Sequence, residues 1–232
     1  MTGKKGTLFI VSTPIGNLAD ITFRAVKTLK TVSFIAAEDT RRTRKLLSHL
    51  DIKTKLISYY EHNSFARIPQ LLKHLESGKD VAVVTDAGTP GVSDPAYKLI
   101  RSVIQIEVKV EPIPGPSAFL TALVASGLPT DRFLFVGFLP PKKGRRKKLS
   151  DLASYEATLI FYENPKRVVK TLSDIATFLG DRPAVVGREL TKVHEEIIRG
   201  TISELLSYFS RESPRGECVI MIGKDDPNVY FG

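Results

Sequence analysis

The sequence is poor in the residues that build covalent cross-links and metal sites. Of its 232 residues, one is cysteine (Cys218), four are histidine and none is tryptophan. A single cysteine excludes a disulfide within the chain and a cysteine-based metal site. The histidines are scattered, so we interpret each as a surface or turn residue and expect no metal: His49, His62, His74 and His194.

Long hydrophobic runs are also missing. The apolar runs are far shorter than the roughly 20 residues that a membrane-spanning helix needs. Residues 1–16 carry basic residues near their start, but their apolar part is too short for a secretory signal. Together with the single cysteine, these absences predict a cytoplasmic protein without a membrane anchor.

Two common nucleotide-binding patterns are absent. The chain has no G-x-x-x-x-G-K-[ST] phosphate loop, and STPIGN (12–17) follows the first expected strand where a dinucleotide site would have G-x-G-x-x-G. Simple NTPase and NAD-dependent activities are therefore disfavoured.

Negative charge is scarce relative to positive charge. The sequence has 34 Lys and Arg against 25 Asp and Glu, a net charge of +9. A run of like charge is usually only a solvated face, but clustered cations also gain affinity for a phosphate backbone by releasing its counterions. Two dense runs of positive charge in one basic protein favour a polyanionic partner. The first run consists of Arg41, Arg42, Arg44 and Lys45, and the second run consists of Lys142, Lys143, Arg145, Arg146, Lys147 and Lys148.

Strand-like apolar runs alternate with amphipathic helical stretches from end to end. This pattern predicts two α/β domains, 1–113 and 114–224, which meet at PIPGPSA (112–118), while the tail 225–232 carries neither pattern. A hairpin-like succession near the end indicates a mixed second sheet. The second basic run is interpreted as a loop that leads into a helix at 148–155.

The clearest candidate for a binding site is VAVVTDAGTPGVSDP, residues 81–95. Its β-branched run predicts a buried strand, and Gly88 and Gly91 then allow turns and close approaches that a Cβ would forbid. An ordinary strand-to-helix connection has the same pattern. Open α/β sheets, however, bind small ligands where such loops gather at the carboxyl ends of the strands. Four loops follow strands in this way: 12–17, 38–42, 86–94 and 164–167.

Glu38 and Asp39 are paired carboxylates just after an expected strand and just before a basic helix. Either residue could simply cap that helix and interact favourably with its dipole. Alternatively, one of them could accept a proton from a substrate hydroxyl, provided that burial raises its pKa. The pattern leaves both interpretations open.

Several segments together, in this order along the chain, resemble the tetrapyrrole-methylase superfamily. The chain is most similar to the branch that methylates a ribose 2′-hydroxyl of a cytidine in the decoding region of 16S ribosomal RNA. The segments are STPIGNLADIT, AEDTRRT, VTDAGTPGVSDP, PIPGPSA, GFLPPKKG, FYENPKR and GRELTKVHEE.

The resemblance implies a dimeric protein of two α/β domains that binds S-adenosylmethionine in a cleft between them. Asp39 falls where relatives that methylate tetrapyrroles have a proposed catalytic aspartate, so Asp39 or Glu38 is expected to be the general base. The residues expected to contact the cofactor are Pro14, Asp86, Ala87, Gly88, Thr89, Val92, Ser117, Ala118, Glu163 and Leu190.

The leading hypothesis is therefore methylation of the 16S RNA of the small ribosomal subunit. The residues expected to hold the RNA are Arg41, Arg42, Lys142, Lys143, Arg145 and Arg146. Two alternatives stay open, namely a methylase of a free tetrapyrrole-type molecule and an RNA-binding protein without methyl transfer. The charge of +9 disfavours the first of them, because a free macrocycle needs no such surface.

Overall fold

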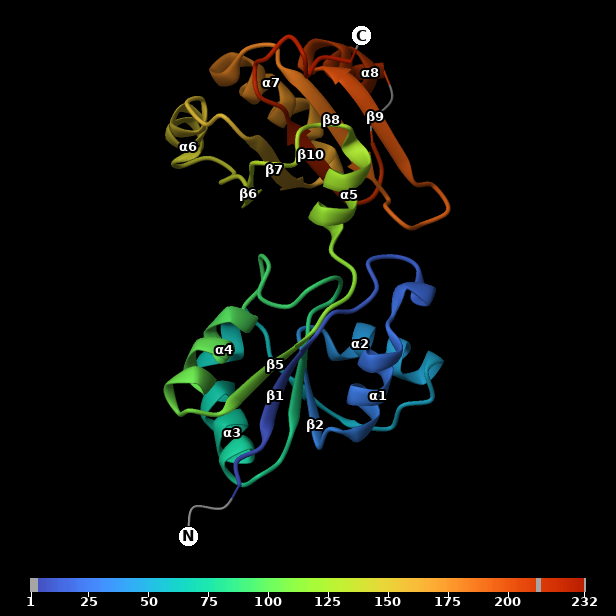
Figure 1. Cartoon of the computed structure of the whole chain (residues 1–232), viewed down its shortest axis with the longest axis vertical. Helices are drawn as coiled ribbons and strands as arrows, with labels where there is room; N and C mark the ends of the chain where they lie inside the picture. The colour runs from blue at the N-terminus through green and yellow to red at the C-terminus, as the bar shows by residue number, and fades with distance from the viewer. Residues whose placement is uncertain (1–3, 212–213, 232) are drawn as a thin grey trace. The chain divides into compact units, whose positions relative to one another are not determined.

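The computed structural model divides into two compact units, Met1–Ser117 and Ala118–Gly232, of which residues 4–211 and 214–231 are described (Figure 1). Each unit has its own five-stranded sheet with helices on its faces. The predicted fold class of two α/β domains is confirmed. The division follows Ser117, inside the PGPSA segment.

The first unit contains a wholly parallel sheet. Its strand order is β3-β2-β4-β1-β5, and helical crossovers join the strands that follow one another in the sequence. The central strand β4 is buried along its whole length, as its β-branched sequence predicts. The strands are β1 (Thr7–Val11), β2 (Phe34–Ala37), β3 (Lys55–Ser58), β4 (Val81–Val84) and β5 (Lys109–Ile113).

Helices cover both faces of this sheet (Figure 1). Helices α1 and α2 pack on one face around Leu29 and Ile35, and α3 and α4 pack on the other around Leu71 and Leu99. The first of these helices begins at Phe23, because the Thr22 hydroxyl accepts the N–H of Ala25 and caps the helix there. The helices are α1 (Phe23–Thr31), α2 (Thr40–His49), α3 (Ser64–Glu76) and α4 (Ala96–Gln105).

The second unit has a mixed sheet of order β6-β7-β10-β8-β9, in which only the β6–β7 pair is parallel. Helix α5 packs against one face, while α6, α7 and α8 bury their apolar residues against the other (Figure 1). The strands are β6 (Phe133–Phe138), β7 (Thr158–Glu163), β8 (Pro183–Arg188), β9 (Glu196–Thr201) and β10 (Cys218–Ile222). The helices are α5 (Ala118–Ser126), α6 (Arg145–Leu152), α7 (Val168–Leu179) and α8 (Ile202–Arg211).

The predicted loop through the second basic run is wrong in part. Helix α6 begins at Arg145, after Gly144 in a left-handed conformation, so four of the six residues of the run are helical. Its buried residues, Arg145, Leu149 and Leu152, follow the spacing of one helical face. Arg145 therefore lies on the side of α6 that packs against the core.

The tail, to which the sequence assigned no element, returns to the second unit. The Tyr230 hydroxyl donates to the carbonyl of Asp181 at 3.0 Å. The ring of Phe231 lies against Gly127, within 3.4 Å of the position a Cβ would take there. Residues 225–231 are thus part of this unit's packing.

Within the described ranges, no helix has both the length and the apolar character needed to cross a membrane. The same residues contain no group of three or more His, Cys, Asp or Glu side chains that could hold a metal ion.

Candidate functional site

Loops that follow β1 and β4 are joined at the carboxyl edge of the first sheet. Thr13 and Gly88 form an isolated antiparallel bridge, with the Thr13 N–H donating to the Gly88 carbonyl at 2.9 Å and the reverse bond at 3.0 Å. The Thr13 hydroxyl also donates to the carbonyl of Thr85 at 3.2 Å. These bonds place the STPIG and DAGTP segments side by side.

Thr89 connects these two loops to the one that follows β5. Its hydroxyl donates to the Pro116 carbonyl at 3.1 Å and lies 3.1 Å from the Ser12 hydroxyl. Because a threonine hydroxyl has one proton, Ser12 must be the donor in the second bond. Gly115 packs so closely that a Cβ there would lie 3.0 Å from the Cβ of Ser12.

The residues expected to bind the cofactor are divided between the units. Seven of them lie in the loops just described, where Ala87 is exposed and most of the others are half-buried: Pro14, Asp86, Ala87, Gly88, Thr89, Val92 and Ser117. The other three lie in the second unit: Ala118, Glu163 and Leu190. The loop 164–167 follows β7 and so belongs to the second unit, not to the edge of the first sheet.

The Glu163 carboxylate is held by the protein's own donors. Its side chain is 1% exposed. One oxygen accepts from the backbone N–H of Asn164 at 2.7 Å and from Nε of Arg167 at 2.8 Å, and the other accepts from the Thr171 hydroxyl at 2.7 Å. Any cofactor contact at this position therefore falls to the backbone rather than to the carboxylate.

Leu190 is also buried, and its side chain packs within 3.3 Å of the position that a Cβ on Gly187 would take. The residues on either side of it, Glu189 and Thr191, have left-handed backbones, with φ of 49° and 66°. Such strain in non-glycine residues is frequent at ligand sites.

Of the two residues expected as the general base, Asp39 is firmly paired. It caps α2, with its Oδ1 accepting the N–H of Arg41 at 2.8 Å, and it receives Nε and Nη2 of the same arginine at 3.1 and 2.8 Å. These hydrogen bonds to Arg41 hold the pKa of Asp39 well below its usual range. A carboxyl with so low a pKa is a weak proton acceptor.

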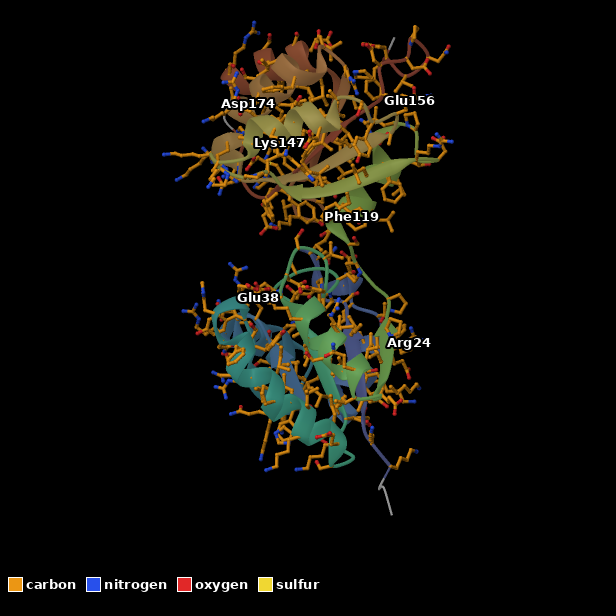
Figure 2. All side chains as sticks on the ribbon, turned by 90° about the vertical axis from the view of Figure 1, so that its left-hand side faces the viewer. Arg24, Glu38, Phe119, Lys147, Glu156 and Asp174 are labelled. Atoms are coloured by element: carbon orange, nitrogen blue, oxygen red, sulfur yellow. The ribbon has the colours of Figure 1, made fainter. Side chains whose placement is uncertain are left out.

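Glu38 (Figure 2) precedes Asp39 in the chain and follows strand β2 directly. Its Oε2 accepts the Thr85 hydroxyl at 2.6 Å and, more distantly, the N–H of Asp86 at 3.4 Å. The Asp86 carboxylate in turn accepts the N–H of Asp39 through Oδ1 at 2.9 Å and faces Arg42 through Oδ2 at 3.3 Å. Burial is the main cause that raises the pKa of Asp86.

A hollow of about 200 Å³ opens at this edge of the first unit. Helix α2 and the loops after β1 and β4 form its wall. Sequence reasoning missed five of its residues: Thr13, Leu18, Thr43, Leu46 and Thr85. The signal was available for two of them, because Thr43 and Leu46 lie one helical turn apart on α2. The whole lining of the hollow consists of Thr13, Pro14, Leu18, Arg42, Thr43, Lys45, Leu46, Thr85 and Asp86.

The residues expected to bind RNA are not equivalent. Arg41 and Arg42 are 85% and 65% exposed at the start of α2. Lys142, Lys143 and Arg146 are exposed too. By contrast, the Arg145 side chain is 8% exposed, donates to Asp174 at 2.7 Å and to the Thr171 hydroxyl at 2.8 Å, and so faces the protein rather than a ligand.

Comparison with known proteins relates this geometry to a family. Residues 7–206 match the family described as Tetrapyrrole (Corrin/Porphyrin) Methylases. A protein of Halalkalibacterium halodurans named Ribosomal RNA small subunit methyltransferase I is 51% identical over 224 residues, which are 96% of this chain and 78% of that protein. A protein of the same name from Thermotoga maritima is 47% identical over 221 residues, which are 95% of this chain and 100% of that protein.

Solved structures share the fold at lower identity. The uroporphyrin-III-C-methyltransferase of Thermus thermophilus matches with a TM-score of 0.67 and 18% identity, over 95% of each chain. A cobalt precorrin-4 methyltransferase matches with a TM-score of 0.69 and 20% identity, over 94% of each chain. Since the family match extends over most of the sequence and about half of the aligned residues are identical in curated relatives, the chain belongs to the tetrapyrrole (corrin/porphyrin) methylases.

Proposed function

We propose that this protein methylates a ribose 2′-hydroxyl of a cytidine in the decoding region of 16S ribosomal RNA. One observation carries the proposal, namely that about half of the residues along nearly the whole chain are identical in relatives named as methyltransferases of small-subunit ribosomal RNA. The exposed arginines at the start of α2 support an anionic substrate of this kind.

S-adenosylmethionine supplies the electrophilic methyl group when it is bound. The residues of the first unit fit such a ligand, because the exposed Ala87 and the buried Gly88 next to it have little or no side chain and let a ligand approach the backbone. Their loop is held by the bonds of Thr13 and Thr89, so it is ordered before any ligand arrives. We propose Pro14, Ala87, Gly88, Thr89, Val92 and Ser117, with Ala118 and the backbone of Glu163 and Leu190, as the cofactor site.

Thr89→Val should weaken binding of S-adenosylhomocysteine by roughly tenfold, measured by calorimetry. The isosteric change removes two hydrogen bonds that join three loops, each contributing about 0.5–1.5 kcal/mol. Thr31→Val is the matched control, since the Thr31 hydroxyl also donates within 3.1 Å of two carbonyls, those of Lys27 and Thr28 in α1. Equal affinities of the two variants would contradict a role for Thr89 in shaping the site.

For the acceptor, the chain must do two things. It must hold the RNA so that the hydroxyl points in line at the methyl group, and it must remove the proton of a weakly acidic alcohol. Exposed Arg41, Arg42, Lys142, Lys143 and Arg146 are proposed to contact phosphates, which position the RNA without reading its sequence. The carboxylates at the edge of the first sheet are the candidates for the proton acceptor.

The test is methyl transfer to small ribosomal subunits that lack the modification. Purified protein and labelled S-adenosylmethionine should yield 2′-O-methylcytidine, identified by mass spectrometry of digested nucleosides. A free tetrapyrrole, assayed in parallel, should stay unlabelled. Cofactor binding without any transfer to the subunits would contradict the proposal, and so would label on the macrocycle.

The homodimeric state that the resemblance implies and the cytoplasmic location that the sequence predicts are further parts of this proposal. Sedimentation of the purified chain should give twice the mass of 25.7 kDa. A monomer that methylates the subunits at the full rate would contradict the proposed homodimeric state.

A further inference from the structure

The hollow at the edge of the first unit combines the surfaces that a nucleotide requires. Apolar side chains of Pro14, Leu18 and Leu46 form part of its lining, and the cations Arg42 and Lys45 belong to the same lining. Apolar contacts suit a base or a sugar face, whereas cations suit the adjoining phosphates. The single acidic residue of the lining is Asp86, which lies next to Ala87 and Gly88 of the proposed cofactor loop.

The carboxylates near this hollow differ in their partners. Asp39 has both oxygens bound by Arg41 and is not part of the lining. Glu38 accepts the Thr85 hydroxyl and is not part of the lining either. Asp86 uses Oδ1 for the N–H of Asp39, while among the described residues its Oδ2 has only a long 3.3 Å approach to an arginine that is 65% exposed.

We propose that the hollow binds the acceptor nucleotide and that Oδ2 of Asp86 takes the proton of its ribose hydroxyl. This inference rests on the proposed function, and it replaces both the expected role of Asp39 as the base and that of Asp86 as a cofactor contact. The bond from Asp39 N–H to Oδ1 fixes the carboxylate, so Oδ2 points in one direction. Asp39 is then a positioning residue that acts through Asp86.

The step balances without any further reactant. The hydroxyl oxygen forms a bond to the methyl carbon, the bond from that carbon to sulfur breaks, and its electron pair stays on the sulfur, which becomes a neutral thioether. The proton passes from the hydroxyl to Oδ2 of Asp86 and later to water.

Electrostatics favour Asp86 over Asp39 as a proton acceptor. Burial and the nearby Glu38 and Asp39 raise the pKa of Asp86, while the Asp39 N–H and Arg42 act in the opposite direction. Arg41 also interacts with Asp86. Transfer should fall as the pH drops through this pKa, because only the ionised carboxylate accepts a proton. Loss of the Arg42 charge should raise the pKa and move that fall to higher pH.

The first experiment compares Asp86→Asn with Asp39→Asn in single-turnover methylation of small ribosomal subunits at saturating RNA and cofactor. Asp86→Asn should slow transfer by about 100-fold or more, with the affinity for S-adenosylhomocysteine unchanged within threefold. Asp39→Asn should slow it by less than about tenfold, since asparagine still caps α2. Asp51→Asn is the matched control and should transfer at the wild-type rate, because Asp51 follows the far end of α2 in a left-handed conformation that asparagine tolerates.

The outcomes separate this inference from the proposed function. If the wild type methylates the subunits but Asp86→Asn transfers within fivefold of it, the role of Asp86 is wrong and the proposed function stands. If Asp86→Asn loses cofactor affinity in proportion to rate, Asp86 is a cofactor ligand and the inference is also wrong. If the wild type transfers nothing to the subunits, both proposals fail.

A second measurement covers the case in which Asp86→Asn does not fold. Arg42→Gln, at saturating RNA, should shift the acidic fall of the transfer rate to higher pH, a change that a merely structural role of Asp86 would not produce. An unmoved pH profile would overturn the inference.

Leu18→Trp should fill the hollow and raise the KM for the subunits at least tenfold, with Ile104→Trp on α4 as a control of similar exposure. A wild-type KM for Leu18→Trp would show that the acceptor nucleotide does not bind in the hollow.

Discussion

Replacing Lys142, Lys143, Lys147 and Lys148 together with glutamine should weaken binding to small-subunit ribosomal RNA by roughly 100-fold. All four side chains are exposed, at or just before helix α6, which carries Lys147 (Figure 2). Each phosphate contact with a single strand contributes about 0.7 to the slope of log affinity against log salt, so the slope should fall by about 3. Filter binding or fluorescence anisotropy across a salt series measures both quantities.

The neighbouring Arg145 is the control within the same run. Arg145→Met should leave the salt slope unchanged, because this side chain is 8% exposed and pairs with Asp174. It should instead lower the free energy of unfolding by about 2 kcal/mol, since Asp174 and the Thr171 hydroxyl both lose a partner. If Arg145→Met and the lysine variant reduced the salt slope alike, burial would not be what distinguishes them.

Glu163→Ala should lower the free energy of unfolding of the second unit by about 3–5 kcal/mol. The carboxylate is buried and accepts from Asn164, Arg167 and Thr171, so its removal leaves these donors, one of them charged, without an acceptor. The midpoint of thermal unfolding should drop by about 12–20 °C. Calorimetry and urea titration measure the two quantities.

Two variants separate the charge of Glu163 from its position. Glu163→Gln keeps an acceptor oxygen but loses the ion pair with Arg167, and it should fall between the wild type and Glu163→Ala. Glu156→Ala removes an exposed carboxylate of the same unit and should change stability by less than about 0.5 kcal/mol (Figure 2). A Glu163→Ala protein as stable as Glu156→Ala would show that the buried network contributes nothing to folding.

The alternation of apolar runs and amphipathic stretches was sufficient to predict two α/β units, because strand and helix periods are local properties of the chain. Element ends were less predictable. Helix α1 starts at Phe23 because of the Thr22 cap, and α6 starts at Arg145 because Gly144 turns the chain there. The face of α6 could have been read from Arg145, Leu149 and Leu152, which repeat with helical spacing, but the density of charge around them obscured it.

The sequence by itself determined which loops follow strands and therefore which small residues meet at the edge of the first sheet. Only the tertiary structure decided which charged groups are available there. The sequence alone does not distinguish Asp39 from Asp86. In the structure, however, Arg41, two residues further along the chain, donates to both carboxylate oxygens of Asp39. The partner that orients Asp86 is 47 residues away, on another strand end. The pKa and exposure of a side chain depend on neighbours that folding brings together. Position in a motif therefore predicted where the carboxylates lie, but not which of them is available to accept a proton.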